Sequence, residues 1–188
     1  MKRETIENIL NFLKTNEDKE LPRSWFDSIE KLKLIERLEN HIGGIQFKHV
    51  GDLNLEGSNI RKLPKYLYVT GYLNLYDCKQ LTELPDKLHV GGSFWIDYSN
   101  ITELPEYLHV RHNLDLQDCK ELIKLPNGLH VGESLDLRGT NISELPNDLY
   151  IGWNLFIKGT PLAENYTVDE IRKMITTKGG KIIAKIFK

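Results

Sequence analysis

The stretch VGESLDLRGTNISELPNDLY, residues 131–150, decides the fold of this 188-residue chain, because variants of it recur along most of the sequence. Its Leu-Pro pair returns at Leu63-Pro64, Leu84-Pro85, Leu104-Pro105, Leu125-Pro126 and Leu145-Pro146. Successive prolines are therefore 21, 20, 21 and 20 residues apart. A fixed period of this length is typical of a solenoid, in which each unit stacks on the next.

A second landmark keeps the same period: a triplet whose outer residues are apolar. The triplets are residues 53–55 (LNL), 73–75 (LNL), 94–96 (FWI), 114–116 (LDL), 135–137 (LDL) and 155–157 (LFI). This alternation predicts a short strand whose outer residues face a core and whose middle residue faces solvent. Proline cannot donate to a strand ladder, so the Leu-Pro side of each unit is predicted to be irregular or extended.

The alternation between 20 and 21 residues also has a local source. The longer units contain DCKQL at residues 77–81 and DCKEL at residues 118–122, one residue more than the other units have there. Cys78 and Cys119 are thus equivalent positions two turns apart, at about 10 Å, which is too far for a disulfide. We expect both thiols to be buried in the core.

The unit V-G-x-x-L-x-L-x-x-(S/T/C)-x-I-x-x-L-P-x-x-L-(H/Y) resembles the leucine-rich-repeat family, whose core is L-x-x-L-x-L-x-x-N-x-L-x-x-L-P. The resemblance is to the short units of about 20 residues in bacterial and phage proteins, and it covers about six units in residues 50–162. Two positions depart from the family. Its first leucine is replaced by Thr70, Gly91, Arg111, Gly132 and Gly152, and its asparagine by Ser58, Cys78, Ser99, Cys119, Thr140 and Thr160.

The resemblance implies an α/β repeat solenoid, a horseshoe or short superhelix with a parallel sheet on one face. On this reading residues 1–49 form a helical N-terminal cap, ending in a first strand at 45–47. Residues 163–188 form a C-terminal cap, in which the capping box TVDE at 167–170 opens a helix and residues 181–187 form a strand. These caps leave no room for a separate catalytic domain.

Composition excludes several classes of function. The chain is 40% hydrophobic, 28% charged and has a net charge of −2, so no global field points to nucleic acid or anionic lipid. Residues 50–160 hold 10 Lys and Arg against 15 Asp and Glu, whereas residues 161–188 hold 6 against 3. No apolar run is long enough to cross a membrane, and the N-terminus lacks the features of a secretory signal. We therefore expect a cytoplasmic protein without membrane contact.

The outward side chains of the triplets and their neighbours form the candidate binding face, since the strand face is the usual binding face in the resembled family. Exposed aromatic rings beside carboxylates are typical anchors of an interface. The residues expected to contact a partner are Tyr72, Tyr76, Trp95, Asp97, Asp115, Gln117, Asp136, Arg138, Phe156 and Lys158. The alternative is that this polar face only keeps the solenoid soluble.

Three other patterns offer alternatives. One column contains Tyr68, His89, His109, His130 and Tyr150. It could hold a metal, but the pattern favours a stacked aromatic ladder. Asp97, Asp115 and Asp136 could form a carbohydrate-active or hydrolytic site, although open carboxylates lack the burial that separates their pKa values. The basic C-terminal segment could contact nucleic acid. We expect a non-enzymatic module that binds a protein partner, with no cofactor or metal, and by resemblance a bacterial or phage accessory, effector or anti-defence role.

Overall fold

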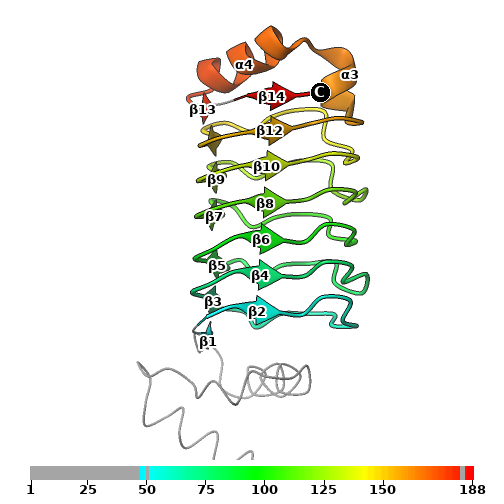
Figure 1. Ribbon diagram of the computed structural model, residues 1–188, viewed down its shortest axis with the longest axis vertical. Helices are drawn as coiled ribbons and strands as arrows, with labels where there is room; N and C mark the ends of the chain where they lie inside the picture. Colours follow the sequence, from blue (N-terminus) through cyan, green and yellow to red (C-terminus); the bar gives the residue numbers. More distant parts are fainter. Residues whose placement is uncertain (1–46, 50, 183–184) are drawn as a thin grey trace, which may run out of the picture.

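The computed structural model describes residues 47–49, 51–182 and 185–188, and in these the chain winds into a parallel β-solenoid (Figure 1). Two sheets of seven parallel strands run along the stack. Within a sheet, Leu53 lies beside Leu73, and Leu73 beside Phe94, so neighbouring strands are 20 or 21 residues apart. The solenoid and its period are therefore confirmed. The helices expected in residues 1–46 lie outside the described residues.

One of the two sheets, named sheet B, contains the predicted triplets. Its strands are β2 (Leu53–Asn54), β4 (Leu73–Asn74), β6 (Phe94–Trp95), β8 (Leu114–Asp115), β10 (Leu135–Asp136), β12 (Leu155–Phe156) and β14 (Ile186–Phe187). The outer residues of the triplets are buried, as expected, because they face the shared core. Asn74 and Asp136 occupy outward positions yet are only 9% exposed, since neighbouring side chains cover them.

A second sheet, sheet A, corrects the expected architecture. Its strands are β1 (Phe47–His49), β3 (Leu67–Val69), β5 (His89–Val90), β7 (His109–Val110), β9 (His130–Val131), β11 (Tyr150–Ile151) and β13 (Lys181–Ile182). A parallel sheet was expected on one face and is present, but the chain has a second parallel sheet as well, and the α/β horseshoe is not confirmed. The described residues form a β-solenoid whose turns stack in a straight column (Figure 1).

The core is a column of leucine, isoleucine and valine side chains with Phe94 among its largest members. The inward Cys and Thr side chains of the repeats donate to backbone carbonyls. Thr140 Oγ1 donates to Leu137 O at 2.7 Å, and the buried Cys78 Sγ donates to Leu55 O at 3.1 Å. In the longer units the extra residue is taken up by a second tight turn, closed by the Leu81 N–H on Cys78 O at 3.0 Å.

After the repeats, the chain forms α3 (Pro161–Asn165) and α4 (Val168–Thr177) at the end of the stack (Figure 1). The capping box predicted at 167–170 is present, with Glu170 bonding the Thr167 backbone N–H at 2.8 Å. The single terminal strand predicted at 181–187 is instead two strands, since β13 pairs with β11 and β14 pairs with β12. No helix in the described residues is long and apolar enough to span a bilayer.

Candidate functional site

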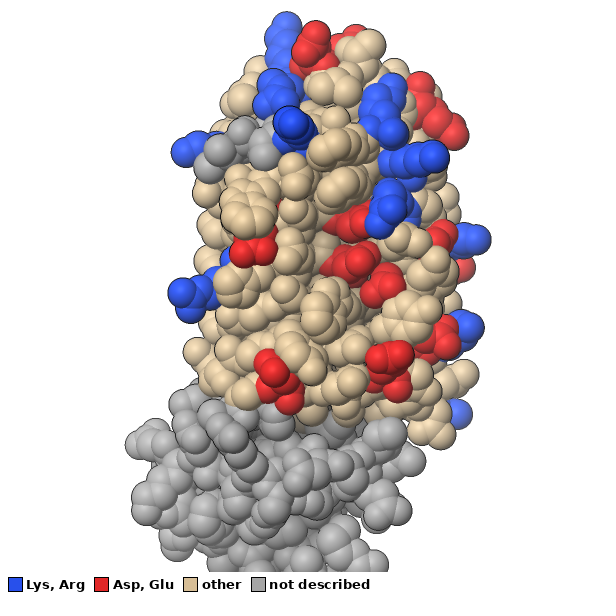
Figure 2. Space-filling view, in the orientation of Figure 1, with Lys and Arg blue, Asp and Glu red and all other residues tan. Residues whose placement is uncertain are grey.

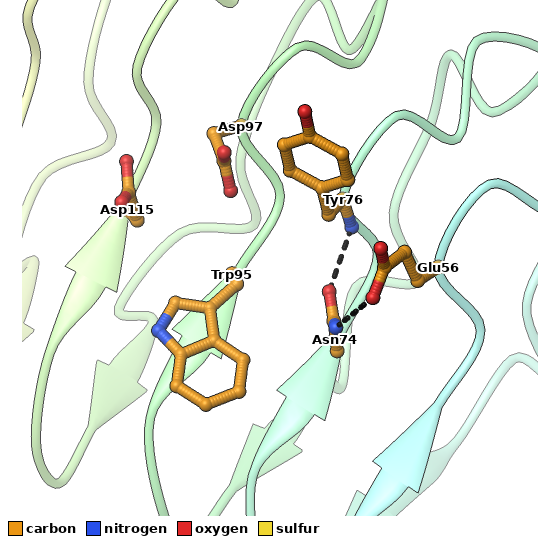
Figure 3. Close-up of a pocket in the computed structure, with 6 residues that line it drawn as sticks. All are labelled: Glu56, Asn74, Tyr76, Trp95, Asp97 and Asp115. Atoms are coloured by element: carbon orange, nitrogen blue, oxygen red, sulfur yellow. Dashed lines mark hydrogen bonds between the residues drawn. The ribbon is translucent and has the colours of Figure 1, made fainter.

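Six side chains on the outward face of sheet B line an open depression of about 320 Å³ (Figure 3). They are Glu56, Asn74, Tyr76, Trp95, Asp97 and Asp115, and they belong to β4, β6, β8 and the turns that follow β2, β4 and β6. Equivalent residues of neighbouring turns lie about 4.8 Å apart, which is why four consecutive turns can meet at one place. Four of these residues were expected at the binding face from the sequence. Glu56 and Asn74 were not among the expected site residues, although they belong to the same outward columns.

The middle position of each triplet has a structural role where it is Asn or Asp. Asn74 Oδ1 accepts the backbone N–H of Tyr76 at 2.9 Å, and Asp115 Oδ1 accepts that of Gln117 at 3.0 Å. These local bonds hold the turn that follows the strand. Trp95 and Phe156 stand at the same position but cannot accept such a bond. The turn geometry therefore does not explain these two aromatic residues, which pack instead on Tyr72 and Phe187.

Aromatic contacts form the walls of the depression. Trp95 packs on Tyr72 with ring centroids 4.9 Å apart, and Tyr76 meets Tyr98 edge-on at 5.6 Å. Gln117 Nε2 donates to Tyr98 Oη at 2.9 Å, which fixes the ring. Tyr98 was missed from the sequence, although it stands where the other units carry only Gly or Asp. The structure gives this position a left-handed φ of 58°, which tyrosine adopts only at a cost.

The carboxylates of the depression differ from ordinary surface acids. Burial, together with the nearby charge of Asp115, raises the pKa of Asp97 from 3.8 to about 6. Burial also raises the pKa of Asp115, and the neighbouring Asp136 adds to the rise. No Lys or Arg among the described residues forms an ion pair with either carboxylate. The expectation that open carboxylates on this face would lack such burial was wrong for Asp97 and Asp115.

The raised pKa of Asp97 predicts that Asp97→Asn stabilises the protein at neutral pH. A carboxyl group whose pKa is higher in the folded state does not lower the free energy of unfolding below about pH 4, where it is protonated in both states. It lowers that free energy increasingly as the pH rises from about 4 through 6. The rise in the pKa of Asp97 corresponds to a loss of at most about 3 kcal/mol in the free energy of unfolding, and solvent screening reduces this loss to about 1–2 kcal/mol. Urea unfolding of the unchanged chain and of Asp97→Asn at about pH 7 and about pH 4 measures the difference in their free energies of unfolding, which should vanish at the lower pH. The exposed Asp86→Asn is the control, and an equal gain from it would contradict the assignment.

The remaining expected residues lie further along the same face. Arg138 forms an ion pair with Asp136 and covers the Phe156 ring, with its guanidinium carbon 5.7 Å from the ring centroid. Phe156 stacks on Phe187 of β14 at 4.9 Å, and Lys158 is exposed beside them. The structure thus divides the expected residues into two groups. Tyr72, Tyr76, Trp95, Asp97, Asp115 and Gln117 surround or adjoin the depression, and Asp136, Arg138, Phe156 and Lys158 form the second group.

The histidine column lies on sheet A as a stacked ladder. His130 stacks on His109 and on Tyr150, each at 4.2 Å, and Tyr68 stacks on His89 at 4.0 Å, all within 9° of parallel. Ring nitrogens direct their lone pairs in the ring plane, so parallel rings do not aim them at a common point. Burial lowers the pKa of His89 and His130, and the neighbouring His109 adds to this. Among the described residues, no three His, Cys, Asp or Glu side chains are placed to hold a metal ion.

The basic C-terminal residues do not form one compact patch. Lys173 lies on α4, whereas Lys181 and Lys185 lie at β13 and directly before β14. Lys178 Nζ and Lys188 Nζ each donate to a backbone carbonyl, those of Leu145 and Tyr166. Contact between this segment and nucleic acid stays a prediction.

Comparisons with known proteins add no relative from which a function could be transferred. No protein-family model matches the chain, and no curated protein and no solved structure is significantly similar to it. The repeat solenoid therefore rests on the chain's own geometry, and membership of the leucine-rich-repeat family stays an expectation from its sequence motif.

Proposed function

We propose that this protein is a non-enzymatic binding module that holds a protein partner on the outward face of sheet B. The observation that carries the proposal is the depression, where the rings of Tyr76 and Trp95 lie beside the Asp97 and Asp115 carboxylates. Half-buried carboxylates without a cation destabilise the free protein, and a cation from a partner would remove that cost. Aromatic rings around such a centre are the residues that contribute most to protein interfaces.

The scaffold supports this function because it is rigid where the site lies. The turns that follow β4 and β6 have backbones bonded to both neighbouring turns, as in the Leu75 N–H on Trp95 O at 2.7 Å and the Leu55 N–H on Asn74 O at 2.8 Å. A preformed surface loses little conformational entropy when it binds. The resemblance to bacterial and phage repeat proteins supports an effector or anti-defence role in the cytoplasm, and this part of the proposal rests on family analogy alone.

The double variant Trp95→Ala with Asp115→Arg tests the proposal. We expect affinity capture from host lysate, read by mass spectrometry, to lose its specific partner, because the variant removes an anchor and inverts a charge. Ile123→Ala with Glu144→Arg is the matched control, since it truncates one exposed apolar residue and reverses one exposed acid outside the sheet B face. If the double variant captures the same partner as the unchanged protein, the face is wrongly assigned.

A second candidate function is a carbohydrate-active or hydrolytic site. It is favoured by the pKa of about 6 at Asp97 next to Asp115, because glycosidases use two carboxylates that differ in protonation. The openness of the depression argues against it, since water reaches the site freely. Asp97→Asn separates the two functions. It would remove hydrolysis of a glycan substrate, whereas capture of a protein partner would persist with reduced affinity.

A further inference from the structure

The outward face of sheet B carries opposite charges at its two ends. At the outward positions in and beside β2 to β8, four carboxylates and no Lys or Arg are present: Asp52, Glu56, Asp97 and Asp115. The same positions in and beside β10 to β14 carry Arg138, Lys158 and Lys185 against the single carboxylate of Asp136. Figure 2 shows this separation, with acidic side chains over the lower and middle turns and basic ones nearer the helical end.

Within one chain Arg138 pairs with Asp136 and lowers the otherwise raised pKa of the neighbouring Asp115, whereas Lys158 and Lys185 on one half and Asp97 on the other do not neutralise each other. Lys158 and Lys185 form no ion pair with a carboxylate of the described residues, and neither do Asp97 and Asp115 with a cation. Three strand spacings separate β6 from β12, about 14 Å, which exceeds the distance over which physiological salt leaves surface charges coupled. The face therefore holds two complementary halves that one molecule cannot bring together.

We propose that the occupant of this face is a second copy of the chain, packed face to face with its solenoid axis antiparallel. A two-fold axis along the strand direction and through β8 lays β2, β4 and β6 of each copy on β14, β12 and β10 of the other. The Trp95 depression of one copy then receives Lys158 and Phe156 of the second copy, and the symmetry makes this contact twice. A parallel arrangement would instead place like charges on one another. The inference rests on the proposed function, because it names the partner of that same face.

The size of the face indicates how strong this dimer is. Seven strands at about 4.8 Å and about five residues at about 3.3 Å give about 550 Å² per copy, or about 1,100 Å² in total. That lies at the low end of specific interfaces. The dimer is therefore expected to dissociate in the micromolar range and to weaken as salt screens its charges.

Sedimentation velocity on the purified full chain tests the dimer, from about 1 to about 100 μM. We expect a monomer–dimer equilibrium that shifts at least about tenfold toward monomer between about 0.05 and about 0.5 M NaCl. Glu56→Lys with Asp97→Lys removes the net negative charge of the β2–β8 half and gives the face a net positive charge, whereas Lys158→Glu with Lys185→Glu makes the whole face acidic. Each double variant alone should be monomeric, and their equimolar mixture should dimerise again. Lys124→Glu with Glu144→Lys, outside the face, should dimerise like the unchanged chain.

Three results would overturn the dimer: a monomer at every concentration, a dimer that survives both charge reversals, or a mixture that stays monomeric although circular dichroism shows both variants folded. A monomeric chain that still captures another protein through Trp95 and Asp115 would remove the dimer and leave the proposed function intact. If each charge-reversed variant is monomeric and their mixture dimerises, the result supports the dimer and the proposed function together.

Discussion

Gly152→Ala should lower the free energy of unfolding by at least about 3 kcal/mol. A Cβ atom at this buried position would lie 1.9 Å from the carbonyl oxygen of Gly132 and 2.8 Å from its carbonyl carbon, both backbone atoms of the neighbouring turn. The backbones cannot separate freely, because the Gly152 N–H bonds Val131 O at 3.0 Å and the Trp153 N–H bonds Glu133 O at 2.9 Å. Overpacking against a fixed backbone is among the costliest single substitutions.

Gly159→Ala is the matched control. Its Cβ would meet nothing nearer than 3.8 Å, so only the left-handed φ of 73° makes alanine unfavourable there, at about 1 kcal/mol. Urea unfolding followed by circular dichroism measures both variants. Equal losses from the two substitutions would show that close approach of the turns is not what requires glycine at position 152.

The repeat could be read from the sequence because its landmarks are periodic side chains. The triplets predicted sheet B correctly, since two buried residues around an outward one define a strand locally. Sheet A carries the same signal, because triplets with buried outer residues recur at 67–69, 88–90, 108–110, 129–131 and 149–151. These triplets were interpreted only as part of an aromatic column, so the second sheet was missed. The structure also shows that Gly91 and Gly92 lie where the backbones of stacked turns touch.

The candidate site could be predicted in its position but not in its electrostatics. Column positions alone placed Tyr76, Trp95, Asp97 and Asp115 on one face, and all four line the depression. The pKa of Asp97 could not be inferred, because it depends on how far side chains from other turns cover the carboxyl group. Burial of this kind arises from packing between residues 18 or more positions apart, which local sequence patterns do not contain.

Phe94→Ala should cost about 3–5 kcal/mol, whereas Trp95→Ala, one residue further, should cost under about 1 kcal/mol. Phe94 is fully buried, and the strands on both sides hold the cavity open, so the core cannot collapse around alanine. Trp95 is only half-buried and loses its contact with Tyr72, 4.9 Å away. Thermal and urea unfolding measure the stabilities, and partner capture is measured on the same samples, with loss expected for Trp95→Ala.

This pair of variants tests the register on which the whole candidate site depends. Successive residues of a strand face opposite sides, so a shift of one residue would exchange the two results. Trp95 shares its side of the sheet with Asp97, and the paired strand places Asp115 beside it. If Trp95→Ala were the more destabilising variant, these carboxylates would point into the apolar core, where unpaired charges are not tolerated. A large loss from Phe94→Ala and a small one from Trp95→Ala therefore links the stability of the solenoid directly to the outward placement of its acidic, aromatic depression.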